Sequence, residues 1–312
     1  MPLLVSIVIP CHNAAPWLAQ ALESALAQTW SPTEIILVDD GSTDESLAIA
    51  RTFEGKGVSV VTQENRGASA ARNHGLRLSH GAFIQFLDAD DLLAPEKIAR
   101  QLELADGFGP DMALCCAWSR FTRDPVDADN TPQPLCCNAE PIDWVVTKLS
   151  CDAMMHPAAW LIPRSLVERA GPWDESLTLD DDGEYFTRVV LASRGVRFCP
   201  GATSFYRSGL ARSLSGSKSL RAWDSALRSL ELTSARLRCA EDSPRTRRAC
   251  ATAFQQFIYS SFPEAAVCRR RAAALVAALG GSDLKPPGGP RFQLARRLLG
   301  WRLAKRLALL LR

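Results

Sequence analysis

The chain has 312 residues, of which 47% are hydrophobic and 22% are charged, and its net charge at pH 7 is +2. These totals are typical of a globular protein with a sizeable core and one or two domains. No run of about 18 uncharged apolar residues occurs, so the sequence predicts no membrane-spanning helix.

The charge is distributed unevenly along the chain. Residues 1–210 carry 16 Lys and Arg against 28 Asp and Glu, whereas residues 211–312 carry 20 against 6. We therefore expect an acidic body over residues 1–210, with halves at 1–110 and 111–210, and a separate basic region over 211–312. Such a basic region predicts an anionic partner, of which a membrane surface fits best.

The beginning of the sequence and its cysteines indicate a compartment. The first residues, Met-Pro-Leu-Leu-Val, have no basic segment and lead directly into a strand pattern, so we expect no secretory signal peptide. Ten cysteines occur without a Cys-x-x-Cys pair, which argues against a zinc ribbon. A reducing cytoplasm is the expected location.

The first hundred residues alternate strand and helix patterns. Apolar runs predict strands over residues 5–10, 34–40, 58–61 and 83–87, and apolar residues at helical spacing predict helices over 16–28 and 68–78. This β-α-β-α-β-α-β order predicts a parallel, right-handed, doubly wound α/β sheet.

Three of these strands end in polar residues. They are Cys11, His12 and Asn13 after the first strand, Asp39 and Asp40 at the end of the second, and Asp88 and Asp90 after the fourth. Ligands of open parallel sheets bind beyond the carboxyl ends of the strands, so these ends predict a nucleotide site in one crevice. Arg72 on helix 68–78 can pair with a phosphate there. The alternative is that Arg72 is an exposed helix arginine.

The fourth strand leads into Asp88-Ala89-Asp90-Asp91. The small Ala89 lets a bulky ligand come close, and two carboxylates one residue apart suit Mg²⁺ or Mn²⁺ that also holds a diphosphate. The alternative is structural, in which Asp91 caps a helix that begins near Pro95.

The second half contains another cluster of acids. Residues 112–121 predict a strand, and the Asp-, Asn- and Pro-rich residues 123–140 predict a loop or flap. Four acids then precede or begin a helical apolar stripe: Asp180, Asp181, Asp182 and Glu184. They can stabilise the start of that helix through its macrodipole. Because four acids exceed this need, a general base held near the helix start is the alternative.

The C-terminal region reads as helical. Helical patterns cover residues 220–240 and 246–279, residues 282–290 form a Pro- and Gly-rich linker, and residues 292–311 predict a last helix. Residues 291–312 contain seven basic and no acidic residues, which predicts a helix lying on anionic lipid. Docking on the body and a homodimer contact are the alternatives. Nucleic acid is not expected, because no aromatic platform accompanies the charge.

Four sequence blocks in register resemble the family 2 glycosyltransferases. They are VSIVIPCHN at residues 5–13, VDDGSTD at 38–44, NRGASAARN at 65–73 and FLDADD at 86–91. The resemblance is strong over residues 4–100, moderate over 150–210 and absent from the tail. It implies a GT-A type fold, in which a Rossmann-like sheet binds a nucleotide sugar, and an inverting transfer from a donor that is usually UDP-linked.

The resemblance also assigns roles by position. On the donor side it implies a nucleotide-sugar site made of Pro10, His12, Asn13, Asp39, Asp40, Arg72, Asp88 and Ala89. In that site Asp40 reads the base, Arg72 approaches the diphosphate and Asp88 lies by the ribose or donor sugar. Asp90 holds Mn²⁺ or Mg²⁺, and Asp182 falls where the family keeps its catalytic base.

One departure from the family pattern stands out. Many members place a His soon after a Tyr-Arg pair like Tyr206-Arg207, whereas Ser208-Gly209-Leu210 follows here. A metal or phosphate contact from that loop is therefore not expected.

The sequence thus predicts a metal-dependent inverting glycosyltransferase, located in the cytoplasm and peripherally on the inner membrane face. It would extend a lipid-linked or cell-surface glycan from a UDP-sugar. A sugar nucleotidyltransferase is a second reading, but it would be expected to carry a Gly-rich loop after the first strand, and Cys11-His12-Asn13-Ala14 has no glycine. A non-catalytic scaffold that binds nucleotide or membrane is a third.

Overall fold

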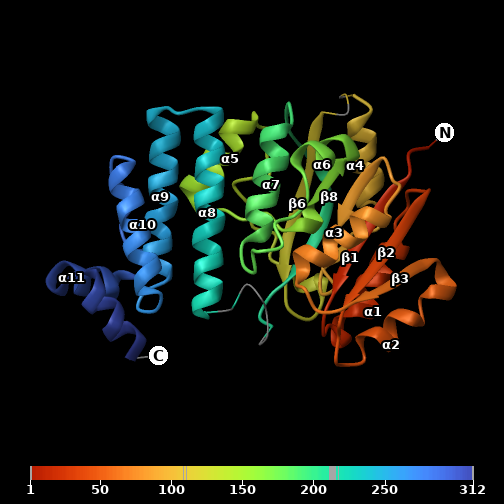
Figure 1. Ribbon diagram of the computed structural model, residues 1–312, viewed down its shortest axis with the longest axis horizontal. Coiled ribbons are helices and arrows are strands. Elements are labelled where there is room, and N and C mark those ends of the chain that lie inside the picture. The colour runs from red at the N-terminus through yellow and green to blue at the C-terminus, as the bar shows by residue number, and fades with distance from the viewer. Residues whose placement is uncertain (1, 108, 110, 211–215, 217, 311–312) are drawn as a thin grey trace.

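The computed structural model describes residues 2–107, 109, 111–210, 216 and 218–310. One eight-stranded sheet occupies one end of the molecule, and the C-terminal helices occupy the other (Figure 1). The strands are β1 (Val5–Cys11), β2 (Thr33–Asp40), β3 (Val58–Gln63), β4 (Phe83–Phe86), β5 (Leu92–Leu93), β6 (Met112–Phe121), β7 (Trp160–Pro163) and β8 (Gly195–Arg207). Their spatial order is β3-β2-β1-β4-β7-β6-β8-β5.

Helices connect and cover these strands. They are α1 (Ala15–Leu26), α2 (Ser46–Arg51), α3 (Ala68–Leu78), α4 (Lys97–Ala105), α5 (Pro141–Cys151), α6 (Arg164–Ala170), α7 (Asp181–Ala192), α8 (Leu220–Ala240), α9 (Pro244–Ser260), α10 (Ala266–Ala278) and α11 (Pro290–Leu310). The α/β architecture with a C-terminal helical extension confirms the expected fold class.

The nucleotide half has the predicted parallel arrangement. β1 is buried along its whole length and pairs in parallel with β2 on one side and with β4 on the other. A strand that is buried on both faces needs a continuous apolar run, which residues 5–10 supply. Because β4 lies across β1 from β2 and β3, the winding direction reverses between β1 and β4. That switch point opens the crevice in which ligands of such sheets bind.

The second half makes the sheet mixed. β7 runs antiparallel to both β4 and β6, and β8 runs parallel to β6 and antiparallel to β5. The short β5 therefore closes one edge of the sheet directly after the Asp88–Asp91 segment. This pairing ties the acidic segment to the end of β8.

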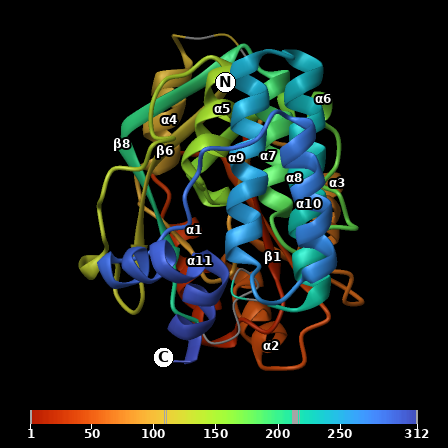
Figure 2. The same cartoon turned by 90° about the vertical axis from the view of Figure 1, so that its left-hand side faces the viewer.

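The C-terminal helices share the main hydrophobic core. One cluster of buried side chains contains Phe86 of β4, Trp144 of α5, Phe186 of α7, Leu227 of α8 and Phe254 of α9. Helices α8, α9 and α10 stand side by side in front of the rest of the molecule in Figure 2. The domain division at residue 210 stays a prediction, and this core crosses it.

Two expectations about the C-terminal region need correction. The pattern over residues 246–279 is not one helical stretch, since α9 ends at Ser260 and α10 starts at Ala266, with Pro263 between them. The last helix is broken at Gly300, where φ is +74°, a conformation that glycine adopts at little cost. Residues 311 and 312 of the expected helix lie outside the described residues.

Two further properties of the structure are the state of the cysteine thiols and the length and apolar character of the helices. All ten cysteines have free thiols. Within the part of the chain that the structure describes, no helix has both the length and the apolar character needed to cross a bilayer.

Candidate active site

The carboxylate of Asp40 organises the loop between β3 and α3. It is almost fully buried and accepts hydrogen bonds from the backbone N–H of Arg66 (2.9 Å) and Gly67 (2.8 Å) and from the amide of Gln63 (2.7 Å). Three donors thus satisfy both oxygens of this buried side chain. Asp40 therefore holds the Asn65–Gly67 loop against the end of β2.

His12 and Asn13 extend this network across the end of β1. The ring Nδ1 of His12 lies 2.9 Å from the backbone oxygen of Asp40, and the amide of Asn65 lies 3.0 Å from the same nitrogen. The side-chain oxygen of Asn13 accepts from the backbone N–H of Thr43 at 2.7 Å. Both side chains are exposed, so this edge presents polar groups to solvent.

Pro10 and Asp39 lie just beneath this edge. Pro10 is a buried residue of β1, and Asp39 of β2 accepts a long hydrogen bond from the backbone N–H of Ser42 (3.3 Å). The second carboxylate oxygen of Asp39 is buried without a partner among the described residues. The sequence-predicted donor residues of β1 and β2 thus lie together.

Arg72 of α3 connects the nucleotide half to the acidic segment of the second half. Its guanidinium donates to Asp88 (2.7 Å) and to Asp181 (2.9 Å), and it stacks 4.4 Å above the ring of Trp173. Burial alone would lower the pKa of Arg72, but the charges of Asp88 and Asp181 outweigh burial and raise it. Arg72 is therefore a buried, permanently charged bridge, and the exposed-helix alternative is wrong.

Asn73, the next residue of α3, connects this helix to the segment before α7. Its side-chain oxygen accepts from the backbone N–H of Trp173 (2.8 Å), and its amide donates to the Trp173 oxygen (2.9 Å) and to Glu175 (3.0 Å). Trp173 in turn stacks on Tyr185 of α7 at 4.0 Å. These contacts fix the start of α7 relative to α3.

A hollow of about 750 Å³ lies between the two halves. Its nucleotide side is formed by the Asn65–Ala68 segment, Arg72 and Asp88, and its far side by residues of α5, of the 153–157 segment, of the start of α7 and of the start of α8. Asp182 lines the hollow together with Asp88. Asp90 and the exposed groups on β1 and β2 are not among the residues that line it.

Among the described residues, Asp182 is the acid of this hollow whose carboxylate has no side-chain partner. Asp181 accepts hydrogen bonds from Arg72 and from the hydroxyl of Ser69 (2.9 Å), whereas Asp182 accepts only from the backbone N–H of Gly183 (2.8 Å) among the described residues. Burial, with the nearby charges of Asp181 and Asp180, raises the pKa of Asp182 to about 7. A carboxylate with such a pKa can accept and release a proton near neutral pH.

Asp180 sets the geometry at this helix start. It adopts φ +59°, which Asp tolerates better than most residues, and its carboxylate and backbone oxygens both accept from Ser229 of α8 (2.7 Å each). A side chain at Gly183 would collide with that carboxylate, since a Cβ there would lie 2.1 Å from one of its oxygens. The C-terminal region thus helps to position Asp182.

Asp91 does not cap a helix, contrary to the structural alternative. It is fully buried, accepts from the backbone N–H of Arg207 (2.8 Å) and lies 2.8 Å from Nδ1 of His156. Burial raises the pKa of Asp91 and lowers the pKa of His156 to about 3. Both shifts disfavour charge, so Asp91 and His156 form a neutral hydrogen-bonded pair, of which His156 lines the hollow.

The carboxylate of Asp90 forms no ion pair with a described residue, and the nearby charge of Arg207 offsets its burial only in part. Burial and the charges of Asp91 and Asp88 raise the pKa of Asp90 to about 8, and Arg207 donates to its backbone oxygen, not to its carboxylate. Among the described residues, no group of three or more His, Cys, Asp or Glu side chains is placed to hold a metal ion. Mg²⁺ commonly takes only one or two carboxylates and completes its shell with water and substrate phosphates, so Asp90 fits a cation shared with a donor.

Several residues of the hollow were missed by sequence reasoning. They are Lys148, Met154, His156, Glu175 and Arg221. They come from four separate segments, and nothing in their local pattern signals a shared site. Ser69, whose hydroxyl donates to Asp181, was also missed, although it stands one helical turn before Arg72.

The fold is that of the GT-A type glycosyltransferases. Staphylococcus aureus TarS, in a crystal structure with UDP-GlcNAc, is similar with a TM-score of 0.63 and 15% identity over 97% of this chain and 90% of that one. A mannosyltransferase from Pyrobaculum calidifontis, in complex with GDP-Man and Mn²⁺, is similar with a TM-score of 0.58 and 20% identity, covering 100% of this chain and 81% of that one.

Residues 6–148, a little less than half of the chain, match the model of glycosyl transferase family 2. An uncharacterised glycosyltransferase of Rickettsia typhi is 30% identical over 191 residues, which span 61% of this chain and 59% of that protein. The succinoglycan biosynthesis protein ExoU of Rhizobium meliloti is 44% identical over 110 residues, which span 34% of this chain and 32% of ExoU. The match therefore covers less than two thirds of these relatives.

Proposed function

We propose that the chain is a metal-dependent, inverting glycosyltransferase. It moves a sugar from a nucleotide sugar, UDP-linked, to a hydroxyl of a glycan or lipid-linked acceptor in cell-surface polysaccharide synthesis. The observation that carries the proposal is the hollow in which Arg72 and Asp88 face Asp182. The UDP-GlcNAc complex of TarS supports the donor class, and the succinoglycan role of ExoU supports the acceptor class.

The hollow and the polar edge beside it have separate tasks in this proposal. Asp40 and His12 at that edge hold the nucleoside together with the Asn65–Gly67 loop, and Asp88 in the hollow lies by the ribose or donor sugar. Asp182 takes the proton from the acceptor hydroxyl, which then attacks the anomeric carbon from the side opposite the leaving nucleotide. Asp181 cannot serve equally well, because Arg72 and Ser69 already occupy it.

Asp90 would hold Mn²⁺ or Mg²⁺. When bound, the cation stabilises the negative charge that develops on the leaving diphosphate. The Mn²⁺ complex of the Pyrobaculum mannosyltransferase supports this part of the proposal. The family match favours this reading over a sugar nucleotidyltransferase or a non-catalytic scaffold.

A panel of UDP- and GDP-sugars tests the donor class. Each is added with Mn²⁺ or with EDTA, melting temperatures are measured, and nucleotide release is followed for those that bind. We expect stabilisation by UDP-sugars with Mn²⁺, loss of it with EDTA, and no metal effect in Asp90→Ala. Preferential stabilisation by GDP-sugars would reassign the nucleotide, and full stabilisation of Asp90→Ala by UDP-sugar and Mn²⁺ would remove Asp90 as the metal ligand.

We also propose that α11 rests on an anionic membrane surface at the cytoplasmic face. Seven leucines of α11 are 40–82% exposed: Leu294, Leu298, Leu299, Leu303, Leu307, Leu309 and Leu310. Exposed arginines stand between them, and cytoplasmic leaflets are anionic, with about 1 kcal/mol of attraction per basic residue near the surface. The other face of α11 docks on the body through Trp301, whose ring lies 5.0 Å from Tyr259 and 5.1 Å from Phe262.

Vesicle flotation tests this surface. We expect the full chain to float with phosphatidylglycerol vesicles and not with phosphatidylcholine vesicles. Combined Leu298→Ser, Leu303→Ser and Leu307→Ser should abolish flotation. Combined Leu3→Ser, Val126→Ser and Val267→Ser, which alter exposed apolar residues elsewhere, should not. The result would identify a homodimer contact instead if the chain bound neither kind of vesicle and sedimented as a dimer. In that case the three α11 substitutions should convert the dimer to a monomer.

A further inference from the structure

The far wall of the hollow carries two cations that form no ion pair within the described part of the chain. Four basic side chains line the hollow: Arg66, Arg72, Lys148 and Arg221. Arg66 pairs with Glu175 at 2.7 Å, and Arg72 pairs with Asp88 and Asp181. Lys148 and Arg221 form no ion pair with any described residue. Burial raises the pKa of Asp152 and Asp182, and the charge of Lys148 lowers the pKa of each at longer range, but no described carboxylate lies within ion-pair distance of Lys148 or Arg221. The donor groups of both side chains can therefore bind a ligand.

Lys148 and Arg221 both stand on the side of the hollow away from the nucleotide half. Lys148 lies in the last turn of α5 and Arg221 in the first turn of α8, and α5 packs against both α7 and α8. Asp182, at the start of α7, lines the same hollow. A group held by these cations would therefore lie beside the hydroxyl that Asp182 deprotonates.

The start of α8 adds to the positive character of this wall. Ser219, Arg221 and Ala222 line the hollow, so the N-terminal end of α8, where the helix dipole is positive, faces into it. Charged hydrogen bonds from Lys and Arg to a carboxylate or phosphate are the strongest that a binding wall can offer. Arg221 at this helix start and Lys148 at the end of α5 would gain little from a neutral sugar.

We propose that the acceptor carries an anionic group close to the hydroxyl that receives the sugar, and that Lys148 and Arg221 bind it. This inference rests on the proposed glycosyltransferase function. The anion is a sugar carboxylate or a phosphate ester, which share the chemistry that the two cations recognise. Lys148 and Arg221 are then residues that determine acceptor specificity, and Asp182 keeps its separate role as the base.

Matched pairs of ligands test the inference. Methyl β-glucuronide is compared with methyl β-glucoside, and N-acetylglucosamine 1-phosphate with methyl N-acetylglucosaminide. Dissociation constants are measured by titration onto the full chain saturated with UDP and Mn²⁺. We expect the anionic member of at least one pair to bind about tenfold more tightly than its neutral counterpart, and the arm that responds identifies a carboxylate or a phosphate.

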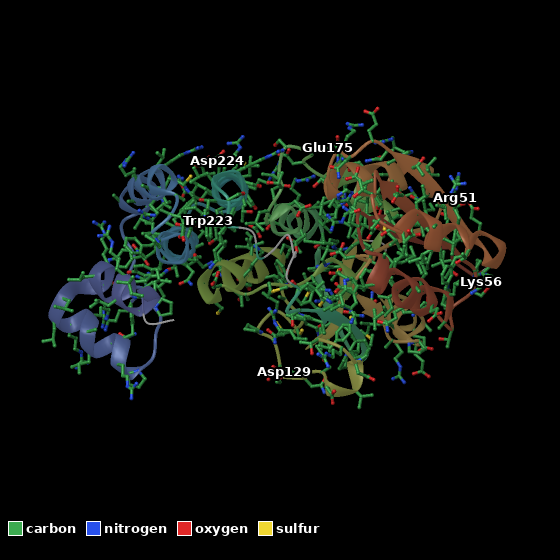
Figure 3. The ribbon with its side chains drawn as sticks, turned by 90° about the horizontal axis from the view of Figure 1, so that it is seen from below. Arg51, Lys56, Asp129, Glu175, Trp223 and Asp224 are labelled. Carbon is green, nitrogen blue, oxygen red and sulfur yellow. The ribbon has the colours of Figure 1, made fainter. Side chains whose placement is uncertain are left out.

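Variants assign the preference to residues. Lys148→Gln and Arg221→Gln should each reduce it to about twofold or less, while the dissociation constant of UDP stays within about twofold of the original. Arg51→Gln is the control, because Arg51 is an exposed arginine at the outer end of the nucleotide half. Figure 3 shows it far from Trp223 and Asp224, which follow the hollow-lining residues of α8.

The contradicting outcomes are distinct. Equal binding of both members in both pairs would overturn the inference without any variant, and so would a preference that survives both substitutions. Loss of UDP affinity in Lys148→Gln and Arg221→Gln would also overturn it, because the cations would then serve the donor diphosphate. A full chain that binds neither UDP nor any nucleotide sugar would instead refute the proposed function on which the inference rests.

Discussion

At the scale of single residues, the protonation of Asp182 should control turnover. A base must be deprotonated to act, and burial with Asp181 and Asp180 raises the pKa of Asp182 to about 7. With saturating donor and Mn²⁺, we expect initial rates to level off above about pH 7 and to fall about tenfold per pH unit below it. A rate that stays constant from pH 5 to pH 8 would show that Asp182 is not the base.

Asp90 should destabilise the metal-free fold at high pH. Its pKa rises from 3.8 to about 8 on folding, so between these values the folded chain holds a proton that the unfolded chain has lost. Stability contributed by this group is therefore present below about pH 4 and is lost as the pH rises towards 8.

Asp90→Asn removes this dependence, because Asn stays neutral. In EDTA at pH 9, we expect the variant to melt at least about 2–4 °C above the original chain, with the gap closing near pH 4. Added Mn²⁺ should raise the melting temperature of the original chain only. A gap that is independent of pH would show that the Asp90 carboxylate is not destabilised by burial.

At the scale of elements, α3 depends on close contact with β1. A Cβ at Gly75 would lie 2.4 Å from a methyl group of Val8, which is fully buried in β1. Overpacking of this kind costs about 1–3 kcal/mol, whereas a Gly-to-Ala change in a helix recovers at most about 1 kcal/mol. We therefore expect Gly75→Ala to lower the free energy of unfolding by about 1–2 kcal/mol.

Urea unfolding checks this prediction against Gly55→Ala. A Cβ at Gly55 meets nothing within 4 Å, so that variant should stay within about 0.5 kcal/mol of the original chain. Because Arg72 lies one turn before Gly75, a displaced α3 should also weaken UDP binding. Equal stability of the two variants would mean that α3 and β1 are packed less closely than described.

The elements also show what the sequence alone can predict. β1 to β4 were predicted from continuous apolar runs, because these strands are buried in the sheet. α3 was predicted from apolar residues at helical spacing, because one face of this regular helix is buried. β8 was not predicted, because Pro200 and Gly201 interrupt its pattern and its register against β6 shifts between Cys116 and Ala117. The α5 helix was also not predicted, although its buried residues Trp144, Val145 and Leu149 stand at helical spacing.

For the site, local motifs predicted the residues but not their contacts. The four family blocks singled out Arg72, Asp88 and Asp90, and the moderate resemblance over residues 150–210 singled out Asp182. The bridge from Arg72 to Asp181, however, joins residues more than a hundred positions apart. His156 and Lys148 enter the site only through the packing of α5 and β8. Tertiary contacts of this kind leave no periodic signal.

At the scale of the whole molecule, α8 to α10 belong to the stability of the body, and α11 does not. Leu227, Phe254 and Phe257 are buried in the same cluster as Trp144 and Phe186. We expect a chain ending at residue 218 to expose this core and to lose its cooperative thermal transition. A chain ending at 289 should melt within a few degrees of the full chain. An independently folded 1–218 fragment would contradict this, and would support a domain boundary near residue 210.

The central claim is that Asp182 acts on the acceptor across a hollow whose other wall holds the nucleotide. Parallel measurement of UDP affinity and of turnover in Asp182→Asn tests it most directly, with Asp129→Asn in the exposed 123–140 loop as the control. We expect Asp182→Asn to bind UDP within about twofold of the original chain and to lose at least about a hundredfold in turnover, with no change in the control. Unaltered turnover in Asp182→Asn, or loss of UDP binding together with turnover, would contradict the claim.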